Sequence, residues 1–139
     1  MIKCVRFLAA AVAAVVFSAC GQSASPPTPR ADGTVLQHVD PDGAVRRLAD
    51  TNVVVLDVRT PDEFKAGHIR GAKLVDFRSA DFAKKLGELD RSKTYLVHCA
   101  SGGRSTSSLE TFQKLGFKSV VHLDGGFNAW KREGKPVEK

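Results

Sequence analysis

The stretch KTYLVHCASGGRSTSSLETFQKLGFKSVVHL, residues 93–123, combines two kinds of hydrophobic pattern. It begins with KTYLVHC and ends with KSVVHL, two short apolar runs of strand length. Between these runs Leu109, Phe112 and Leu115 recur at helical spacing, and Gly116 ends the pattern. A strand, a helix and a second strand in this order predict an α/β arrangement with parallel strands.

The same alternation continues on both sides of this stretch. NVVVLDV, residues 52–58, is a β-branched run typical of a buried parallel strand, and TVLQHV and AKLVDF are shorter candidates. We therefore expect one α/β domain over residues 33–139, with a mostly parallel sheet. Further helices are predicted from Pro41 with Asp40 as N-cap, from Pro61 with Thr60 as N-cap, in SADFAKKLGEL and in GFNAWKREG.

The first residues have a different composition. MIKCVR is basic, and the apolar run FLAAAVAAVVF that follows it is too short for a spanning helix of about 20 residues. Together they predict a secretory signal peptide over residues 1–19. FSAC, which ends at Cys20, resembles the bacterial lipobox, and this resemblance implies that Cys20 is acylated. Ordinary signal cleavage nearby is the alternative.

Residues 20–32 are rich in serine and proline, which predicts an extended tether between the lipidated Cys20 and the domain. We expect an exported protein anchored to a bacterial membrane through lipid alone. The domain would face the periplasm or the cell exterior, and the choice between inner and outer membrane stays open. Cys4 would leave with the signal peptide and Cys20 would carry the lipid, so Cys99 would be the remaining free thiol.

Cys99 lies where a predicted strand ends and a predicted helix begins, which is the edge at which open α/β sheets bind ligands. The backbone amides that follow it can curl around the sulfur, and Gly102 and Gly103 permit the left-handed turns that this requires. The start of the helix, with Ser105 or Ser107 near its cap, and the charge of Arg104 also favour thiolate over thiol. The loop is predicted to hold a reactive cysteine and an anionic substrate.

HCASGGRS at 98–105, LDVRTPDEFKAGHIRGAKLVDF at 56–77 and LDGGFNAWKREGKPV at 123–137 together resemble the rhodanese family. The resemblance implies a three-layer α/β domain in which helices flank a mostly parallel central sheet. It also implies a sulfurtransferase in which Cys99 attacks the outer sulfur of a donor such as thiosulfate, becomes a persulfide and passes the sulfur to a thiol or to cyanide. No cofactor is implied. The loop residues that would bind the donor are Ala100, Ser101, Gly102, Gly103 and Arg104.

Three other functions are weighed against sulfur transfer. Rhodanese-related phosphatases have five residues between cysteine and arginine, whereas four separate Cys99 from Arg104, and the shorter loop suits a single sulfur atom. A non-catalytic module that binds a partner or a sulfur-carrier protein is the second alternative, and the presence of both Cys99 and Arg104 argues against it. A thiol–disulfide oxidoreductase is disfavoured because no resolving cysteine accompanies Cys99.

Asp57 and Arg59 end a strand near the same edge, where we expect a buried pair that braces the loop and supports the site. Gly126 is predicted to let the backbone approach the loop, and Trp130 and Phe127 to pack in the core.

The four histidines complete the candidates. His38 and His122 are interpreted as strand residues, His68 as a hydrogen-bonded turn residue, and His98 as facing away from Cys99. Their spacing shows no metal-ligand pattern, so no metal is predicted. The net charge of +6 is scattered, which disfavours nucleic acid as a partner.

Overall fold

A computed structural model describes residues 26–29 and 33–139 of the chain. The predicted signal peptide and the lipid-modified Cys20 lie outside the described residues, so both stay predictions. Within the described part of the chain, no helix combines the length and the apolar character that crossing a membrane would need.

A six-stranded sheet forms the centre of the domain, in the order β1-β2-β7-β6-β3-β5. All neighbouring strands are parallel except β1, which is antiparallel to β2. The α/β prediction with a mostly parallel sheet is therefore confirmed. The strands are β1 (Thr28–Pro29), β2 (Val35–Val39), β3 (Val53–Asp57), β5 (Lys73–Leu74), β6 (Thr94–His98) and β7 (Ser119–Leu123).

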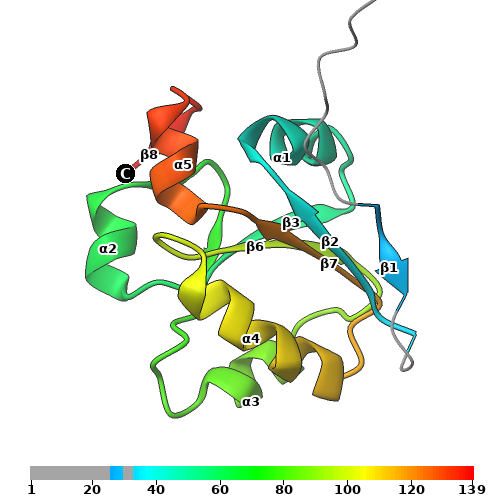
Figure 1. The fold of residues 1–139 in the computed structure, drawn as a ribbon. Coiled ribbons are helices and arrows are strands. Elements are labelled where there is room, and N and C mark those ends of the chain that lie inside the picture. Colours follow the sequence, from blue (N-terminus) through cyan, green and yellow to red (C-terminus); the bar gives the residue numbers. More distant parts are fainter. Residues whose placement is uncertain (1–25, 30–32) are drawn as a thin grey trace, which may run out of the picture.

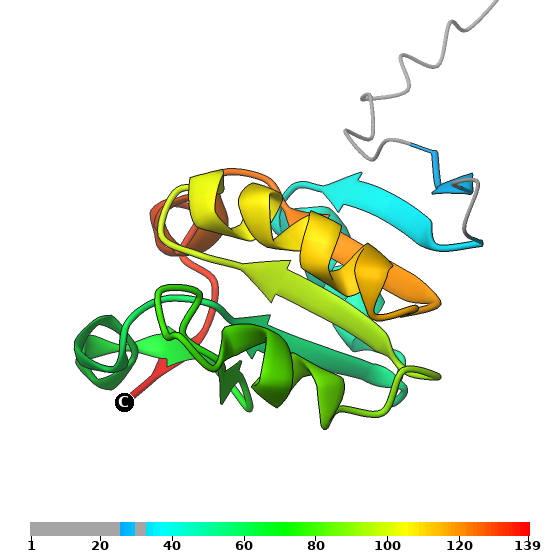
Figure 2. The same ribbon diagram turned by 90° about the horizontal axis from the view of Figure 1, so that it is seen from below.

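Helices cover both faces of this sheet, which makes three layers (Figure 1). The helices α1 and α5 lie on one face, and α3 and α4 lie on the other, where Figure 2 shows them in front of the strands. Helix α2 follows β3 at the carboxyl edge. The bounds are α1 (Pro41–Leu48), α2 (Pro61–Ala66), α3 (Phe82–Gly87), α4 (Gly103–Lys114) and α5 (Gly126–Arg132).

Alternation along the strands divides the apolar side chains between two cores. Leu56 and Val97 belong to the core under α3 and α4, together with Phe112 of α4. Their strand neighbours Val55 and Leu96 belong to the core under α1 and α5, which also contains Phe127 and Trp130 as predicted. Burying one such side chain stabilises the fold by about 1.5–3 kcal/mol.

The helix starts of α1 and α2 follow from their capping residues. The Asp40 carboxylate accepts a hydrogen bond from the Gly43 amide at 2.7 Å, and Thr60 forms a capping box with Glu63. Helix α4 differs from the prediction, because it begins at Gly103, with Gly102 rather than Ser105 or Ser107 at the N-cap position.

Three two-residue strands were not foreseen. Strand β1 lies within the predicted tether, so part of this segment pairs with the sheet instead of acting as a free linker. Strand β4 (His68–Ile69) pairs with β8 (Val137–Glu138) in a separate antiparallel sheet and ties the end of the chain to the turn after α2. His68, predicted as a turn residue, is in β4 and is hydrogen-bonded as expected, from Nδ1 to the Phe64 carbonyl at 3.1 Å.

Candidate active site

Cys99 follows the last residue of β6 and lies at the carboxyl edge of the sheet. The residue exposes 1% of its surface. The backbone amide of Gly102 donates a hydrogen bond to Sγ at 3.1 Å, and the Ser105 hydroxyl lies 3.5 Å from the same atom. The loop therefore curls around the sulfur, as the sequence predicted.

One glycine makes this turn possible. Gly102 has a φ of +107°, in the region that side chains other than glycine rarely adopt, and this conformation points its amide at Sγ. Gly103 is not among the glycines with positive φ, because it already belongs to helix α4. The expectation of two left-handed glycines holds for Gly102 alone.

The surroundings of Cys99 favour its thiolate. Burial raises the pKa of the thiol, but hydrogen bonds outweigh this effect and hold the pKa below that of an ordinary cysteine. They come from the Ser105 hydroxyl and from the backbone amides of Ser105, Gly102 and Ser101. A lowered pKa gives Cys99 a larger fraction of the nucleophilic thiolate than an ordinary cysteine has at the same pH.

The start of α5 fixes the other side of the loop. The carbonyls of Cys99 and Ala100 accept hydrogen bonds from the amides of Phe127 and Asn128 at 2.8 and 2.9 Å. A Cβ at Gly126 would lie 2.5 Å from the Cys99 carbonyl oxygen, so only glycine allows this approach. Ala100, predicted to contact the donor through its amide, thus also anchors the loop through its carbonyl.

Arg104 is the charged residue of the loop, and its guanidinium is already paired. It donates from Nη1 and Nη2 to the two carboxylate oxygens of Glu63 at 2.7 and 2.8 Å. Hydrogen bonding to Glu63 raises the pKa of Arg104, with a further contribution from Cys99. The same pair lowers the pKa of Glu63 to about 2. Sequence reasoning missed Glu63 as a site residue.

Asp57 and Arg59 form the buried pair that was expected. Arg59 donates from Nε and Nη2 to the Asp57 carboxylate at 2.6–2.9 Å, and Nη2 also reaches the Gly67 carbonyl at 2.8 Å. The guanidinium carbon lies 4.1 Å from the ring centroid of Phe127, which joins this pair to the helix that anchors the loop. The pair thus contacts Phe127, whose amide bonds the Cys99 carbonyl, and its role in supporting the site stays a prediction.

His98 faces away from the sulfur, as predicted. It is fully buried, and its Nδ1 lies 3.2 Å from the Cys99 carbonyl oxygen. Burial lowers the pKa of His98 and keeps the imidazole neutral.

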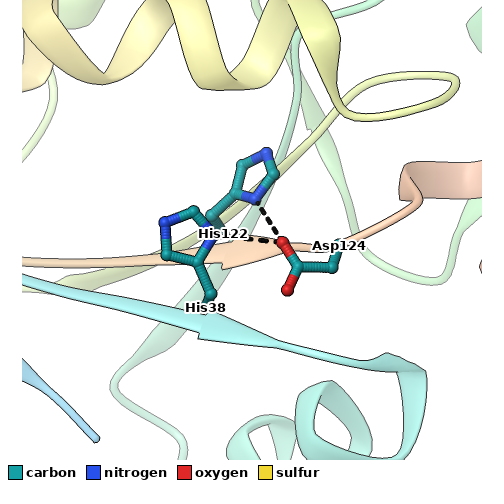
Figure 3. Close-up of side chains that lie close together, drawn as sticks. All are labelled: His38, His122 and Asp124. Atoms are coloured by element: carbon teal, nitrogen blue, oxygen red, sulfur yellow. Dashed lines mark hydrogen bonds and ion pairs between the residues drawn. The ribbon is translucent and has the colours of Figure 1, made fainter. Parts of the chain in front are cut away.

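A second histidine, His122, does reach the site. Its Nε2 lies 2.9 Å from the Ser105 hydroxyl, and its Nδ1 lies 3.1 Å from Asp124 Oδ1. His38 contacts the same oxygen at 3.0 Å, because β2 and β7 pair in a register that sets His38 beside His122 (Figure 3).

Each of these three side chains offers one possible metal-ligand atom, and the three atoms lie within 4.8 Å of one another. The sequence analysis did not find this group, because His38 lies far from His122 and Asp124 along the chain. Hydrogen bonds within the group and to Ser105 account for the arrangement, and we assign no metal to it.

A cavity of about 460 Å³ opens beside the loop. A larger cavity of about 550 Å³ is lined by residues such as Val45 and Trp130 and contains no residue of the cysteine loop, so it is not the reaction site. The smaller cavity reaches the loop at Ala100 and carries Asn128 and Lys131 on its α5 side. Its other lining residues are Arg59, Glu63, Ala66, Gly67, Phe127, Val137, Glu138 and Lys139.

Cys99 and its loop follow the parallel strand β6, in a part of the chain that matches a known family. The sequence model of the rhodanese-like domain family matches residues 40–133. The chain belongs to the rhodanese-like family. In this rhodanese-like domain the matched segment includes Cys99, its loop and the α5 start that anchors it.

Named relatives agree with this assignment. The thiosulfate sulfurtransferase GlpE of Pseudomonas aeruginosa is 36% identical over 96 residues, which cover 68% of this chain and 84% of GlpE. A rhodanese-related protein of Thermoplasma volcanium has a crystal structure that matches with a TM-score of 0.65 and 31% identity, over 73% of this chain and 96% of that one. At the level of the family, the function is sulfur transfer.

Some relatives are much longer. The probable adenylyltransferase/sulfurtransferase MoeZ of Mycobacterium tuberculosis is 34% identical over 84 residues, and the matched region covers 60% of this chain but 21% of MoeZ. The rhodanese-like chain thus corresponds to about a fifth of that protein.

Proposed function

We propose that the chain takes a sulfane sulfur from a small anionic donor such as thiosulfate and carries it as a persulfide on Cys99. The observation that supports this most is the loop around Cys99, in which the Gly102 amide points at Sγ from 3.1 Å. Donors in this position stabilise negative charge on sulfur without changing position during the reaction.

The reaction consists of two displacements. The Cys99 thiolate attacks the outer sulfur of thiosulfate, a new S–S bond forms, and the old S–S bond breaks as sulfite leaves with its electron pair. Cyanide or a thiolate then attacks the outer sulfur of the persulfide, and Cys99 leaves as the thiolate. No net oxidation of the protein occurs over the cycle.

Arg104 would orient the donor and balance its charge. Its electrostatic interaction with Cys99 supports this role, because an anion bound at the sulfur would feel the same positive charge. The cavity beside Ala100 would receive the acceptor, and Lys131 gives it a positive charge. Because the relative MoeZ is named a probable adenylyltransferase/sulfurtransferase, a sulfur-carrier protein is one acceptor to test.

The test is thiocyanate formation from thiosulfate and cyanide by the purified full chain. Cys99→Ser should abolish it, because a hydroxyl does not ionise near neutral pH and cannot hold the sulfur. Arg104→Ala should slow turnover about ten- to a hundredfold, the loss expected for one charge-assisted hydrogen bond. Arg91→Ala, remote from the loop, is the matched control and should behave as wild type.

An aryl phosphate is the discriminating second substrate. The proposal expects no hydrolysis above background, because four residues between Cys99 and Arg104 leave a ring suited to one sulfur atom. Hydrolysis that depends on Cys99, without thiocyanate formation, would replace sulfur transfer by phosphate hydrolysis. Inertness toward thiosulfate, other sulfane-sulfur donors and the phosphate would favour the non-catalytic module.

We also propose, from the sequence, that Cys20 is acylated and anchors the domain to a bacterial membrane, facing the periplasm or the cell exterior. The lipobox-like FSAC and the basic, apolar start of the chain support this.

A further inference from the structure

A chain of hydrogen-bonding groups connects the buried sulfur to the surface. Cys99 Sγ lies 3.5 Å from Ser105 Oγ, which lies 2.9 Å from His122 Nε2. On the other side of the ring, His122 Nδ1 lies 3.1 Å from Asp124 Oδ1. Ser105 is completely buried and His122 almost so, whereas the Asp124 side chain is 54% exposed.

Strand β7 and the first turn of α4 place these groups. His122 and Val120 alternate with the residues of β7 that face α1 and α5, so His122 lies on the α4 side of the sheet. Ser105 is in the first turn of α4, directly above it. Asp124 follows β7 and reaches Nδ1 from the carboxyl edge, as Figure 3 shows.

The hydroxyl of Ser105 has one hydrogen and three neighbouring acceptors. These are Sγ, His122 Nε2 and the Gly102 carbonyl at 3.0 Å. When Nε2 carries a proton, it donates to Ser105 Oγ and leaves the hydroxyl hydrogen free for Sγ. When Nε2 is bare, it competes with Sγ for that hydrogen. A bare His122 Nε2 therefore adds a competitor to the Gly102 carbonyl for the Ser105 hydrogen, while the Gly102 amide donates to Sγ in either case.

Asp124 fixes the opposite nitrogen. A carboxylate can only accept, so Nδ1 must carry its hydrogen toward Oδ1. That leaves Nε2 as the nitrogen that gains or loses a proton.

We propose that His122 is a positioning residue that accepts the Cys99 proton through the Ser105 hydroxyl, with Asp124 holding its ring. The step is balanced: the thiol proton passes to Ser105 Oγ as the hydroxyl proton passes to His122 Nε2, which leaves a thiolate and an imidazolium. The proposal rests on Cys99 being the reactive thiol of the proposed sulfurtransferase. Nε2 also lies 3.3 Å from Thr106 Oγ1 and 3.3 Å from the Gly102 carbonyl oxygen, and of these three neighbouring atoms Ser105 Oγ is the one that also contacts Sγ.

Other charged groups face this relay and set its background. His38 shares Asp124 Oδ1 with His122, and the two ring centroids are 4.9 Å apart. His98 interacts electrostatically with His122 from the neighbouring strand, and Arg104 interacts with Cys99 from α4. None of these groups lies between Ser105 and His122. Replacing His122 therefore removes the hydrogen bond to Ser105, whereas replacing one of the other groups leaves that bond in place.

The test follows the rate of Cys99 alkylation against pH in the purified full chain, with peptide-resolved mass spectrometry to separate Cys99 from Cys4 and Cys20. His122→Gln keeps an amide near Ser105 but cannot take up a proton. We expect the alkylation midpoint to rise by about one pH unit, which leaves roughly tenfold less thiolate below the midpoint. The acid limb of the sulfurtransferase rate should move by the same amount.

Two further variants show whether the effect passes through Ser105. Ser105→Ala should raise the midpoint by a similar amount, and Ser105→Ala/His122→Gln should raise it no further, because one connection is broken in each case. Glu110→Gln, at an exposed position of the same helix as Ser105, is the control and should keep the wild-type midpoint. Should His122→Gln not fold, Asp124→Asn at the exposed end should give a smaller upward shift.

An unchanged midpoint in folded His122→Gln would overturn the relay, as would fully additive shifts in the double variant. Alkylation does not require sulfur transfer. A raised midpoint in a chain that forms no thiocyanate would therefore support the relay and contradict the proposed function.

Discussion

Arg104 and Glu63 form a two-pronged ion pair at the mouth of the cysteine loop, with N–O distances of 2.7 and 2.8 Å. The capping box of α2 holds Glu63 in place, since the Thr60 amide donates to the same Oε2 that accepts from Arg104. The guanidinium is thereby fixed in direction and partly neutralised. An anionic donor approaching the loop meets an arginine that already has a partner.

Replacing Glu63 should expose this charge. In Glu63→Gln we expect KM for thiosulfate to fall about threefold at low ionic strength, with kcat nearly unchanged and the effect reduced at high salt. Steady-state kinetics at two salt concentrations measure it. Glu110→Gln is the matched control, because Glu110 pairs with Lys114 on the exposed side of the same helix as Arg104. A rise in KM would mean that Glu63 serves chiefly to orient Arg104.

The same pair predicts an acid-sensitive part of the stability. The pKa of Glu63 is lowered from an ordinary 4.5 to about 2, so its ionised form is favoured by folding. This contribution is complete above the ordinary pKa and is lost as pH falls from 4.5 toward 2. Urea unfolding should show a difference between wild type and Glu63→Gln that is constant near neutral pH and shrinks over this window. A difference independent of pH would contradict the assignment.

Gly126 should tolerate no side chain. A Cβ there would meet the Cys99 carbonyl oxygen at 2.5 Å, and its φ of +57° is also unfavourable for other residues. We expect Gly126→Ala to cost about 2 kcal/mol or more of unfolding free energy, and to reduce activity because the loop must shift. Thermal and urea unfolding measure the cost.

Gly87→Ala is the control for this substitution. Its Cβ would meet nothing within 4 Å, and the residue lies in helix α3. Alanine should stabilise the protein there by about 0.5–1 kcal/mol. Equal effects at both positions would show that the approach of α5 to the loop is not tight.

Cys20→Ser tests the proposed anchor. If Cys20 carries the lipid, the wild-type chain should fractionate with membranes and the variant should be released from them or retain its uncleaved signal. Immunoblots of membrane and soluble fractions distinguish these outcomes. A wild-type chain that is soluble, with its signal removed at another bond, would contradict acylation.

The elements that sequence patterns specify locally were predictable. Thr60 and Pro61 predict the start of α2, and the β-branched run before Asp57 predicts β3. Both predictions succeed because helix caps and strand patterns depend on residues that are close in the chain. Cys99 and its loop were found for the same reason. Helix α4 was placed too late because Gly102 caps it without a side chain.

Relationships between distant residues were not predictable from one sequence. Glu63 is 41 positions from Arg104, and its role as a helix-start residue gave no sign of the ion pair. His38 and His122 are in contact because β2 and β7 are neighbours in the sheet. The apolar pattern of a strand indicates which of its side chains share a face of the sheet, but not which strand lies beside it. Strands of two residues, such as β4 and β8, are too short to leave a periodic pattern.

The central claim is that Cys99 carries the transferred sulfur, and the mass of the Cys99 peptide tests it most directly. After incubation of the full chain with thiosulfate, this peptide should gain about 32 Da, the mass of one sulfur atom. Cyanide should remove that mass and release an equal amount of thiocyanate, and Cys99→Ser should show neither change. An unmodified Cys99 peptide from a chain that still forms thiocyanate, or the added sulfur on another residue, would contradict the account.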